Sequence, residues 1–485
     1  MKNNIPPLQP ITSPWIQRIA DNYDLQKDLI DTYESPLNIH HLESFQNNLA
    51  EYRYILNHYN FKSKIYYARK ANKCSTLASV AFENGFGVDT ASYEELKQCL
   101  DINISSQDLV LTAAVKNEKL LRLAITNHVL IIIDNKDEAD LILKIAKEEK
   151  LQAIVGFRIS GFEYKDHKLK SRFGFDIDEV GGFIIEFFNS EEVLKYVNFT
   201  GFHFHLDGYD AHQRGAALHQ TLDLIETLIT YGFNPNFIDI GGGILMNYLE
   251  QESSWIKFQE QLKKAVLGKR EPITYQNNGL GFYNRNGEIE GKLNTYPYYN
   301  TTSKEEFLKN VLEIAYVHRK PVSYRLQELD IELRLEPGRS LLDQVGVTIA
   351  RVAHRKKDAD GNFLVGLEMN MTQMASSSED FLLDPIVCYK NKKTAEERAD
   401  VYFTGAYCLE SDFILKRKIS LPKLPEIGDF VIFINTAGYM MHFFETEAHL
   451  FKLSQNVFIN NVDDNVSLLD FYRDENNLET KHIYL

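Results

Sequence analysis

The alternation of apolar and polar positions divides the chain into two regions. Between residues 65 and 335, short apolar runs alternate with segments in which apolar residues recur every three or four positions. The first pattern is typical of buried parallel strands and the second of amphipathic helices. The expected strands are 65–68, 87–89, 108–111, 129–133, 153–159, 199–205, 236–240 and 331–335. The expected helices are 75–84, 93–100, 118–126, 137–149, 192–196, 211–231 and 304–319. This alternation predicts an α/β protein with a closed (β/α)8 barrel.

Both flanks of this region have a different pattern. After residue 347, apolar runs follow one another without helices, at 347–354, 363–369, 386–388, 401–404 and 430–434. They predict a C-terminal β-domain, which we expect also to take in an N-terminal segment with a helix over 15–32 and a short strand at 35–39. The predicted domains are therefore a barrel over 45–340 and a β-domain made of 1–44 and 341–485.

One connection in the barrel is unusually long. Residues 250–303 form an apparent insertion, within which 275–300 is rich in tyrosine, asparagine and glycine. Its sequence Tyr283-Asn-Arg-Asn-Gly-Glu288 has the Asn-Gly signature of a hairpin turn. Connections of this length usually serve as lids or inserted modules.

Composition narrows the class of protein. The chain has 485 residues, of which 44% are hydrophobic, and a formal net charge of −15 with scattered lysines and arginines. This argues against a nucleic-acid or anionic membrane partner. No apolar run suggests a signal peptide or membrane span. The four cysteines lack metal-ligand or disulfide-framework spacing, so we expect a cytoplasmic protein.

Several chemically useful side chains stand at predicted strand ends. Lys70 follows the first strand, where parallel α/β sheets place ligands, and lysine can form Schiff bases, although a solvated surface charge is the alternative. His203 and His205 alternate with phenylalanines and are expected to face inward. We expect them to form a wall for a planar ligand, or to be hydrogen-bonded core histidines. No third metal ligand lies at useful spacing, so no metal is expected.

Two further strand ends complete this set. The strand ending at Asp239 continues into Gly241-Gly242-Gly243, whose backbone N–H groups could bind phosphate, although a tight turn alone would also explain them. Glu336 is expected to face inward and to need a cationic or proton-donating partner, such as a ring nitrogen. The alternative is an internal Glu332/Arg334 ion pair with Glu336 capping the turn.

Together these segments resemble the pyridoxal-phosphate decarboxylases of the alanine-racemase-like fold, the group of diaminopimelate, ornithine and carboxynorspermidine decarboxylases. The resemblance runs in family order over nearly the whole chain. Its motifs are Tyr67-Ala-Arg-Lys70-Ala-Asn72, Gly87-Val-Asp89-Thr-Ala-Ser92, Arg172-Phe-Gly174, His203-Phe-His205, Asp239-Ile-Gly-Gly-Gly243, Glu336-Pro-Gly-Arg339, Cys408 with Asp412, and Gly438-Tyr439.

The resemblance implies a role for each matching residue. Lys70 would hold pyridoxal 5'-phosphate as a Schiff base, His205 would stack on its ring, and Glu336 would pair with the ring nitrogen. Asp89 and Arg158 would lie beneath the cofactor. The phosphate would be bound by Gly208, Gly241, Gly242, Gly243, Gly338, Arg339 and Tyr439. Cys408, from the partner subunit of a homodimer, would return a proton to the substrate at a shared active site.

The chain departs from the family pattern in three places. Leu206-Asp207-Gly208 follows His205 where the family has a turn with a phosphate-binding serine, so Gly208 would act through its backbone. Leu409 stands directly after Cys408 where many relatives have an acidic residue. No arginine between residues 371 and 384 matches the one that grips the distal carboxylate of diaminopimelate. Asp384, Glu410 and Asp412 are therefore the residues that we expect near the substrate.

These features predict a decarboxylase for an amino acid with a long polar or basic side chain, such as a diamino acid or a carboxy-polyamine. An amino-acid racemase of the same fold is the second hypothesis, although racemases tend to pair the ring nitrogen with arginine and this chain offers Glu336. A non-catalytic, decarboxylase-like regulatory protein is the third hypothesis. The presence of Lys70, Glu336 and Cys408 together disfavours it.

Overall fold

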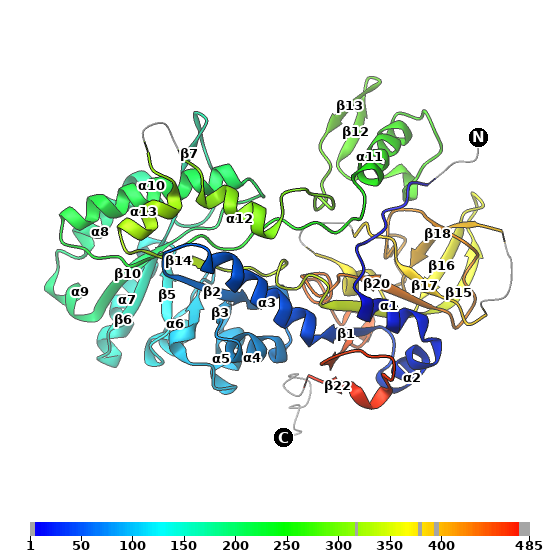
Figure 1. Ribbon diagram of the computed structural model, residues 1–485, viewed down its shortest axis with the longest axis horizontal. Helices are drawn as coiled ribbons and strands as arrows, with labels where there is room; N and C mark the ends of the chain where they lie inside the picture. Colours follow the sequence, from blue (N-terminus) through cyan, green and yellow to red (C-terminus); the bar gives the residue numbers. More distant parts are fainter. Residues whose placement is uncertain (1–4, 316–318, 377–380, 392–396, 475–485) are drawn as a thin grey trace. The chain divides into compact units, whose positions relative to one another are not determined.

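The computed structural model describes residues 5–315, 319–376, 381–391 and 397–474, and the chain divides into two compact units (Figure 1). We call Gln46–Leu245 with Thr302–Leu341 the barrel unit. We call Met1–Phe45, Met246–Thr301 and Leu342–Leu485 the β unit. The segment expected as an insertion in the barrel thus groups, by its contacts, with the β unit.

Parallel strands close the barrel. In the described residues, eight strands follow the order β10-β11-β14-β2-β3-β4-β5-β6, and β6 also pairs with β10 to complete the circle. They are β2 (Ser63–Ala68), β3 (Gly87–Thr90), β4 (Leu109–Leu111), β5 (Leu130–Ile133), β6 (Ala153–Ser160), β10 (Val197–His203), β11 (Phe237–Asp239) and β14 (Glu332–Leu335). A short strand, β9 (Phe175–Asp176), adds to the end of β6. The predicted (β/α)8 barrel is confirmed.

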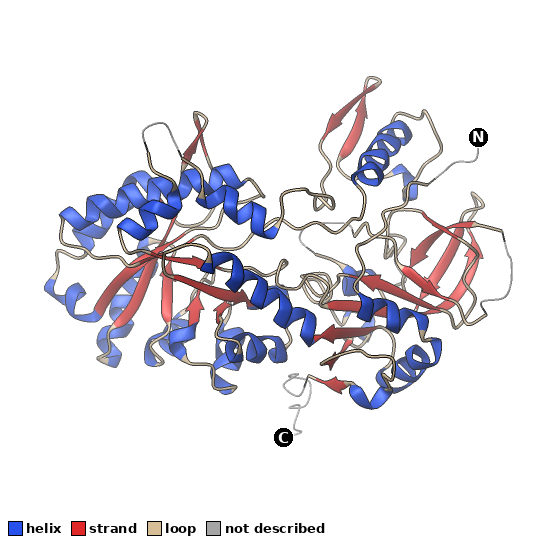
Figure 2. Cartoon of the chain, in the orientation of Figure 1, coloured by secondary structure: helices blue, strands red, loops and turns tan. Residues whose placement is uncertain are grey.

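Helices cover the outside of these strands (Figure 2). They are α3 (Leu42–Asn57), α4 (Ser75–Glu83), α5 (Tyr93–Asp101), α6 (Glu118–Thr126), α7 (Lys136–Glu149), α8 (Ile177–Phe187), α9 (Glu191–Tyr196), α10 (Ala211–Thr230), α12 (Lys304–Leu312) and α13 (Val322–Glu328). Side chains of Ser92, Asn117 and Asn135 cap the first turns of α5, α6 and α7, which fixes where these helices begin. The helix expected over 304–319 ends earlier, at Leu312, and residues 316–318 lie outside the described residues.

The β unit is built on a mixed sheet. Its strands are β1 (Leu37–His41), β15 (Gly346–Lys357), β16 (Phe363–Leu367), β17 (Ile386–Cys388), β18 (Ala399–Thr404), β19 (Ile419–Leu421), β20 (Phe430–Ile434), β21 (Gln455–Ile459) and β22 (Tyr472–Arg473). β1 pairs with β15 on one side and with β21 on the other, so the N-terminal segment lies inside this sheet. Two helices, α1 (Pro14–Asp21) and α2 (Tyr23–Tyr33), replace the single helix expected over 15–32 and pack on the same apolar core.

The segment Met246–Thr301 has structure of its own. It contains α11 (Glu252–Val266) and a hairpin of β12 (Phe282–Arg285) and β13 (Glu288–Gly291), which confirms the predicted Asn286-Gly287 turn. Its Tyr275 ring stacks on Phe413 with centroids 3.8 Å apart, so this residue packs within the β unit.

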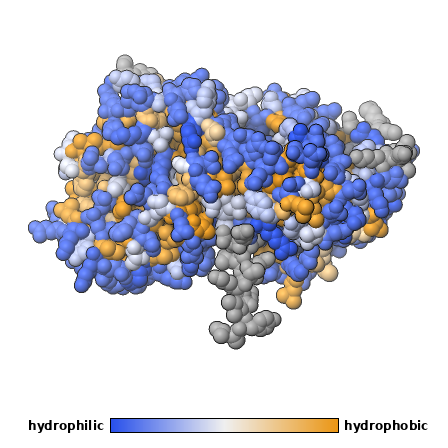
Figure 3. Space-filling model, turned by 60° about the horizontal axis from the view of Figure 1, so that its bottom comes forward, coloured by the Kyte–Doolittle hydropathy of each residue, from blue (hydrophilic) through white to orange (hydrophobic). Residues whose placement is uncertain are grey.

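The face of the molecule that Figure 3 presents carries mostly hydrophilic residues. Figure 3 shows apolar side chains gathered in separate patches among polar ones on the face it presents. Among the described residues, no helix has both the length and the apolar character needed to cross a bilayer.

Candidate active site

Lys70 stands just beyond the carboxyl end of β2. The strand ends at Ala68, and Arg69–Ala71 form a single 3-10 turn that carries the lysine. Its Nζ donates to Oδ2 of Asp89 at 2.6 Å and lies 3.9 Å from Oε2 of Glu336. The amine therefore faces two carboxylates, and its side chain keeps an exposed fraction of 32%. Lys70 is therefore not a solvated surface charge, which was the alternative expected from the sequence.

Asp89, on β3, is completely buried beside this amine. Its Oδ1 accepts a hydrogen bond from the Thr112 hydroxyl, and its Oδ2 receives the Lys70 ammonium. Burial raises the pKa of the Asp89 carboxyl, and the nearby Glu336 raises it further, whereas Lys70 opposes both effects. Asp89 is therefore a buried carboxylate whose charged form is stabilised by the ammonium group of Lys70.

Glu336 follows β14 and has only 2% of its surface exposed. Oε1 of Glu336 has no hydrogen-bond partner in the described part of the chain, although Nε2 of His203 lies 3.3 Å away. Burial lowers the pKa of His203 well below its usual value, so the imidazole is neutral and gives no positive charge. Burial also raises the pKa of Glu336. An unpartnered buried carboxylate oxygen indicates a place for a donor that the protein itself does not supply.

The alternative expected for β14 was an internal Glu332/Arg334 ion pair with Glu336 capping the turn. Only the ion pair is present. Nε of Arg334 does donate to Oε1 of Glu332 at 2.6 Å, as an internal ion pair. Glu336, however, faces Lys70 rather than capping its own turn.

Asp239 joins Glu336 and His203 in a cluster that the sequence did not reveal. One ligand-capable atom from each of the three side chains lies within 4.8 Å of the others, and all three residues are buried. Oδ1 of Asp239 accepts from the N–H of Gly241 at 2.9 Å, whereas Oδ2 has no partner in the described part of the chain. The spacing argument, which found no third ligand for the histidines, is therefore wrong for His203, whereas the absence of a bound metal stays a prediction. The strands β10, β11 and β14 are adjacent, which brings the three residues together.

The glycine triplet after β11 forms a cradle that admits no side chain. A Cβ at Gly241 would lie 2.5 Å from Nδ1 of His205, and one at Gly242 would lie 2.5 Å from the carbonyl oxygen of Glu336. Gly241 and Gly243 have φ values of +66° and +74°, which favour glycine. The N–H of Gly242 donates to Nδ1 of His205 at 3.2 Å, which fixes the imidazole beside the triplet. β10 ends at His203, so His205 lies on the irregular segment that follows the strand rather than on the strand itself.

The remaining predicted barrel residues lie at the same ends of their strands. Arg158, near the end of β6, stacks over Phe173 with its guanidinium carbon 4.2 Å from the ring centre, and its Nη1 lies 3.9 Å from Asp134. Gly208 has a φ of +84° on the turn after His205. Gly338 is buried and Arg339 half-buried, directly after Glu336.

Five predicted residues belong to the β unit, and four of them follow β18 in the chain. Cys408 and Glu410 are exposed on a loop, and Asp412 is buried at its end. The two carboxylate oxygens of Asp412 accept from the N–H groups of Met371 and Tyr407, each at 2.7 Å. Asp412 therefore holds the loop in shape. Tyr439 has a φ of +72° after β20.

Asp384 also lies in the β unit and already has a cationic partner. Its carboxylate forms an ion pair with Arg417, which is almost completely buried, and accepts from the N–H of Leu8 at 3.1 Å.

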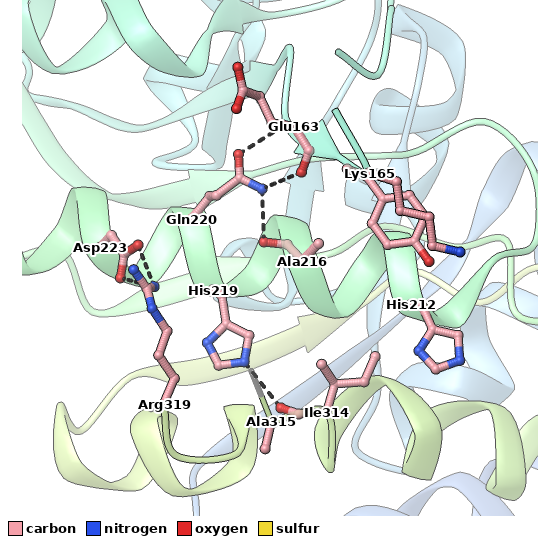
Figure 4. Close-up of a pocket in the computed structure, with 11 residues that line it drawn as sticks. Glu163, Lys165, His212, Ala216, His219, Gln220, Asp223, Ile314, Ala315 and Arg319 are labelled. Atoms are coloured by element: carbon pink, nitrogen blue, oxygen red, sulfur yellow. Dashed lines mark hydrogen bonds and ion pairs between the residues drawn. The ribbon is translucent and has the colours of Figure 1, made fainter. Parts of the chain in front are cut away.

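A separate cavity of about 820 Å³ is lined by residues of α10, of the strand β7 (Glu163–Tyr164) and of the chain that follows α12 (Figure 4). Gln220 exchanges hydrogen bonds with the backbone of Glu163 in β7, and Arg319 is paired with Asp223. His219 contacts the carbonyl oxygen of Ile314 at 3.1 Å. The side chains of Gln220, Arg319 and His219 are therefore engaged by neighbouring protein groups.

The barrel residues fit pyridoxal phosphate. An amine stands at the mouth of the barrel, an unpartnered carboxylate oxygen at Glu336 suits a protonated ring nitrogen, and the glycine cradle leaves backbone room for a phosphate.

Comparison with known proteins agrees with this geometry. Residues 42–274 match the family described as "Pyridoxal-dependent decarboxylase, pyridoxal binding domain". The chain is 31% identical over 420 residues to the uncharacterized protein y4yA of Sinorhizobium fredii, covering 86% of this chain and 85% of that protein. Among solved structures, diaminopimelate decarboxylase from M. jannaschii has a TM-score of 0.68 at 19% identity, covering 92% of this chain and 90% of that one. A lysine/ornithine decarboxylase from Vibrio vulnificus, complexed with putrescine, has a TM-score of 0.61 at 16% identity, covering 93% and 99%.

These matches confirm the resemblance and the alanine-racemase-like fold, in which a barrel accompanies a separate sheet. The chain belongs to the family of pyridoxal-dependent decarboxylases, which are enzymes that use pyridoxal phosphate.

Proposed function

We propose that this enzyme decarboxylates an amino acid with a long polar or basic side chain. The observation that carries the proposal is the unpartnered, buried Oε1 of Glu336 in the same strand-end cluster as Lys70. A carboxylate in that position favours a protonated ring nitrogen, and a protonated ring is a strong acceptor of electrons from Cα. A racemase, the second candidate, would gain from a weaker acceptor, so Glu336 favours decarboxylation.

In this proposal each residue has a defined task. Lys70 holds the cofactor covalently through Nζ, with Asp89 beneath it, and Glu336 keeps a proton on the ring nitrogen. His205, fixed by the N–H of Gly242, forms the wall beside the ring. When bound, pyridoxal phosphate supplies the ring that stabilises negative charge at Cα after CO2 departs. Phosphate-binding roles fall to Gly208, Gly241, Gly242, Gly243, Gly338, Arg339 and Tyr439, and Arg158 supports the site from β6.

The proton that Cα needs afterwards is assigned to Cys408. Its thiol is exposed, and exposed apolar side chains of the β unit include Leu409, Phe443, Phe444 and Leu450. A surface that another subunit covers would bury such side chains, provided that they form one patch. They support a homodimer in which Cys408 serves the site of the partner subunit.

We assign to Glu410 the binding of the far end of the substrate side chain. Asp384 is already neutralised by Arg417, and both carboxylate oxygens of Asp412 are engaged by backbone N–H groups. Glu410 is exposed and free of such structural bonds in the described part of the chain. An ammonium group on a long side chain is the chemistry that this carboxylate would bind.

We also propose that the enzyme works in the cytoplasm. In the described part of the chain, the four cysteines Cys74, Cys99, Cys388 and Cys408 are thiols rather than disulfides. Thiols of this kind persist in reducing compartments.

The deciding experiment combines cofactor binding with product analysis. The purified protein should show the visible absorbance of covalently bound cofactor, which Lys70→Ala should abolish. Lys64→Ala, a change in the same strand β2 that removes an ion pair with Asp108, should preserve it. Incubation with a panel of diamino acids and carboxy-polyamines should release CO2. Enantiomer exchange without CO2 would favour the racemase, and bound cofactor without either reaction would favour the non-catalytic alternative.

The assignment of Cys408 has its own test. Cys408→Ala should lower kcat by about 10²- to 10⁴-fold, the usual contribution of a positioned proton donor, while cofactor binding persists. Mixing Lys70→Ala and Cys408→Ala subunits should then restore part of the activity through hybrid dimers. If subunits exchange and no activity returns, Cys408 does not serve the partner's site.

A further inference from the structure

Arg214 is a buried cation in the barrel unit to which no role has yet been assigned. It lies on the first turn of α10, among the buried residues Ala211, Ala216, Ala217 and Leu218, and only 1% of its surface is exposed. Its Nη2 lies 2.9 Å from the carbonyl oxygen of Gly208, 3.3 Å from that of Gly242 and 3.4 Å from that of Leu206. One guanidinium thus joins the turn after His205 to the glycine triplet after β11.

This charge is not neutralised by an ion pair. No carboxylate of the described residues lies within ion-pair distance of Arg214, and its Nε has no hydrogen-bond partner there. Burial lowers the pKa of Arg214 to about 10, while the charges of Tyr209, Asp210 and Asp207 oppose that shift. Carbonyl dipoles compensate a buried charge only in part, so an anion nearby would stabilise it further.

The orientation of the peptide groups shows where such an anion would gain most. In a trans peptide the C=O and the following N–H point in opposite directions. The carbonyls of Leu206 and Gly242 point at Arg214, so the N–H groups of Asp207 and Gly243 point away from it. Neither of these two N–H groups has an acceptor in the described part of the chain. Arg214 therefore lies behind two turns whose free donors face the other way.

Gly243 links this arrangement to the glycine cradle. A Cβ at Gly243 would lie 2.3 Å from Nη2 of Arg214, so the guanidinium occupies the space that any side chain would need. The turn and the arginine fit each other closely. A displacement of the Arg214 side chain must therefore also move the turn at Gly243.

We propose that Arg214 is the positioning residue for the phosphate of pyridoxal phosphate, taking over in this chain the function of the serine that the family pattern leads one to expect at Gly208. It does not touch the phosphate. It aligns the N–H donors of two turns, and its positive charge favours the dianion in front of them. This inference rests on the cofactor assigned above, but not on which amino acid is decarboxylated.

The test compares two forms of the cofactor on the whole protein stripped of its own. Equilibrium dialysis and absorbance give the dissociation constants of pyridoxal phosphate and of pyridoxal, which lacks the phosphate but can still react with Lys70. Arg214→Met should weaken pyridoxal phosphate by roughly 10- to 100-fold, because it removes charge-assisted hydrogen bonds that hold both turns. Pyridoxal should change by less than about threefold. Arg214→Lys, which keeps the charge, should fall between.

Arg325→Met is the matched control. Arg325 is another buried arginine that binds α10, through His219 and Asp223, away from both turns. Its replacement should leave the ratio of the two constants unchanged. An equal loss of both ligands in the Arg214 variants, no loss of either, or failure of both variants to fold would overturn the proposal. Because the readout is binding, absence of CO2 release in the wild type would refute the proposed reaction without touching this inference.

Discussion

Glu336→Gln separates the catalytic and structural roles of the buried carboxylate. Glutamine has nearly the volume of glutamate and can still form hydrogen bonds, but it carries no charge. In the protein without cofactor, Glu336 is a buried anion with one unpartnered oxygen, next to the neutral His203. Removing that charge should therefore cost the fold little and the reaction much.

The magnitudes follow from the distances. Two unit charges 3.9 Å apart, as between Lys70 and Glu336, attract by about 4 kcal/mol at an effective dielectric constant of about 20. Burying the carboxylate costs several kcal/mol, so the two effects nearly cancel. We expect the free energy of unfolding of the cofactor-free variant to equal or exceed that of the wild type, by about 1 kcal/mol at most.

The catalytic effect should be far larger. An amide cannot hold a proton on the ring nitrogen, and losing one such charge interaction costs about 2–4 kcal/mol of transition-state stabilisation. This corresponds to a fall in kcat of about 30- to 1000-fold.

Unfolding by denaturant and CO2 release measure the two quantities separately. Glu332→Gln is the control, since Glu332 is on the same strand but paired with Arg334, and its change should leave kcat within about threefold. The reasoning fails if Glu336→Gln keeps kcat within that range, or if its cofactor-free form loses more than about 3 kcal/mol.

The same variant has a pH signature. Burial raises the pKa of Glu336 in the folded protein above its ordinary 4.5, so the folded state binds more protons than the unfolded state in that interval. The stability contributed by the protonated form is fully present below about pH 4.5 and is lost as the pH rises through the raised pKa. The advantage of Glu336→Gln over the wild type, measured without cofactor, should therefore appear only as the pH rises above about 4.5.

Two further predictions use matched pairs. Gly241→Ala should destabilise the protein by about 2–4 kcal/mol and weaken cofactor binding, because its Cβ would collide with the imidazole of His205. Gly232 has a φ of +86° but open space around it, so Gly232→Ala should cost only about 1 kcal/mol in thermal unfolding. Asp384→Asn should destabilise by about 3–5 kcal/mol, because it leaves Arg417 buried without its anion, whereas Glu410→Gln should leave stability unchanged and raise KM about tenfold. A raised KM with unchanged stability in Asp384→Asn would instead place Asp384 at the substrate.

Much of the barrel could be predicted because its strands are buried on both sides and read as continuous apolar runs. Three features depended on contacts that the local pattern does not carry. The helix α8 contains Gly181-Gly182, which disfavour helix locally, yet Val180 and Ile184 bury one face of it. The helix α12 ends early, and the Ile314 carbonyl beyond it contacts His219. The composition of Met246–Thr301 gave no sign that Tyr275 would stack on Phe413 of the β unit.

The candidate site was predictable one residue at a time but not as a constellation. Alternation placed Glu336 inward, and glycine composition marked the triplet. The proximity of Asp239 to Glu336 and His203 depends on β10, β11 and β14 being neighbours, which only the strand order reveals. Arg214 carried one weak signal, a charge among the apolar positions of α10, and no motif pointed to it.

The pairing of β1 with β15 and β21 has a consequence for how the protein is made. β1 leaves the ribosome early, but both of its neighbours in the sheet belong to the last third of the chain. Until they are synthesised, this strand, which is buried in the finished fold, has two unpaired edges, the condition in which strands pair with other chains. The barrel meets a similar delay, since β14 follows the segment Met246–Thr301 and must arrive before β2 gains its second neighbour. Neither unit can be completed from a continuous N-terminal fragment, so nascent chains of this enzyme should depend on chaperones until translation is nearly finished.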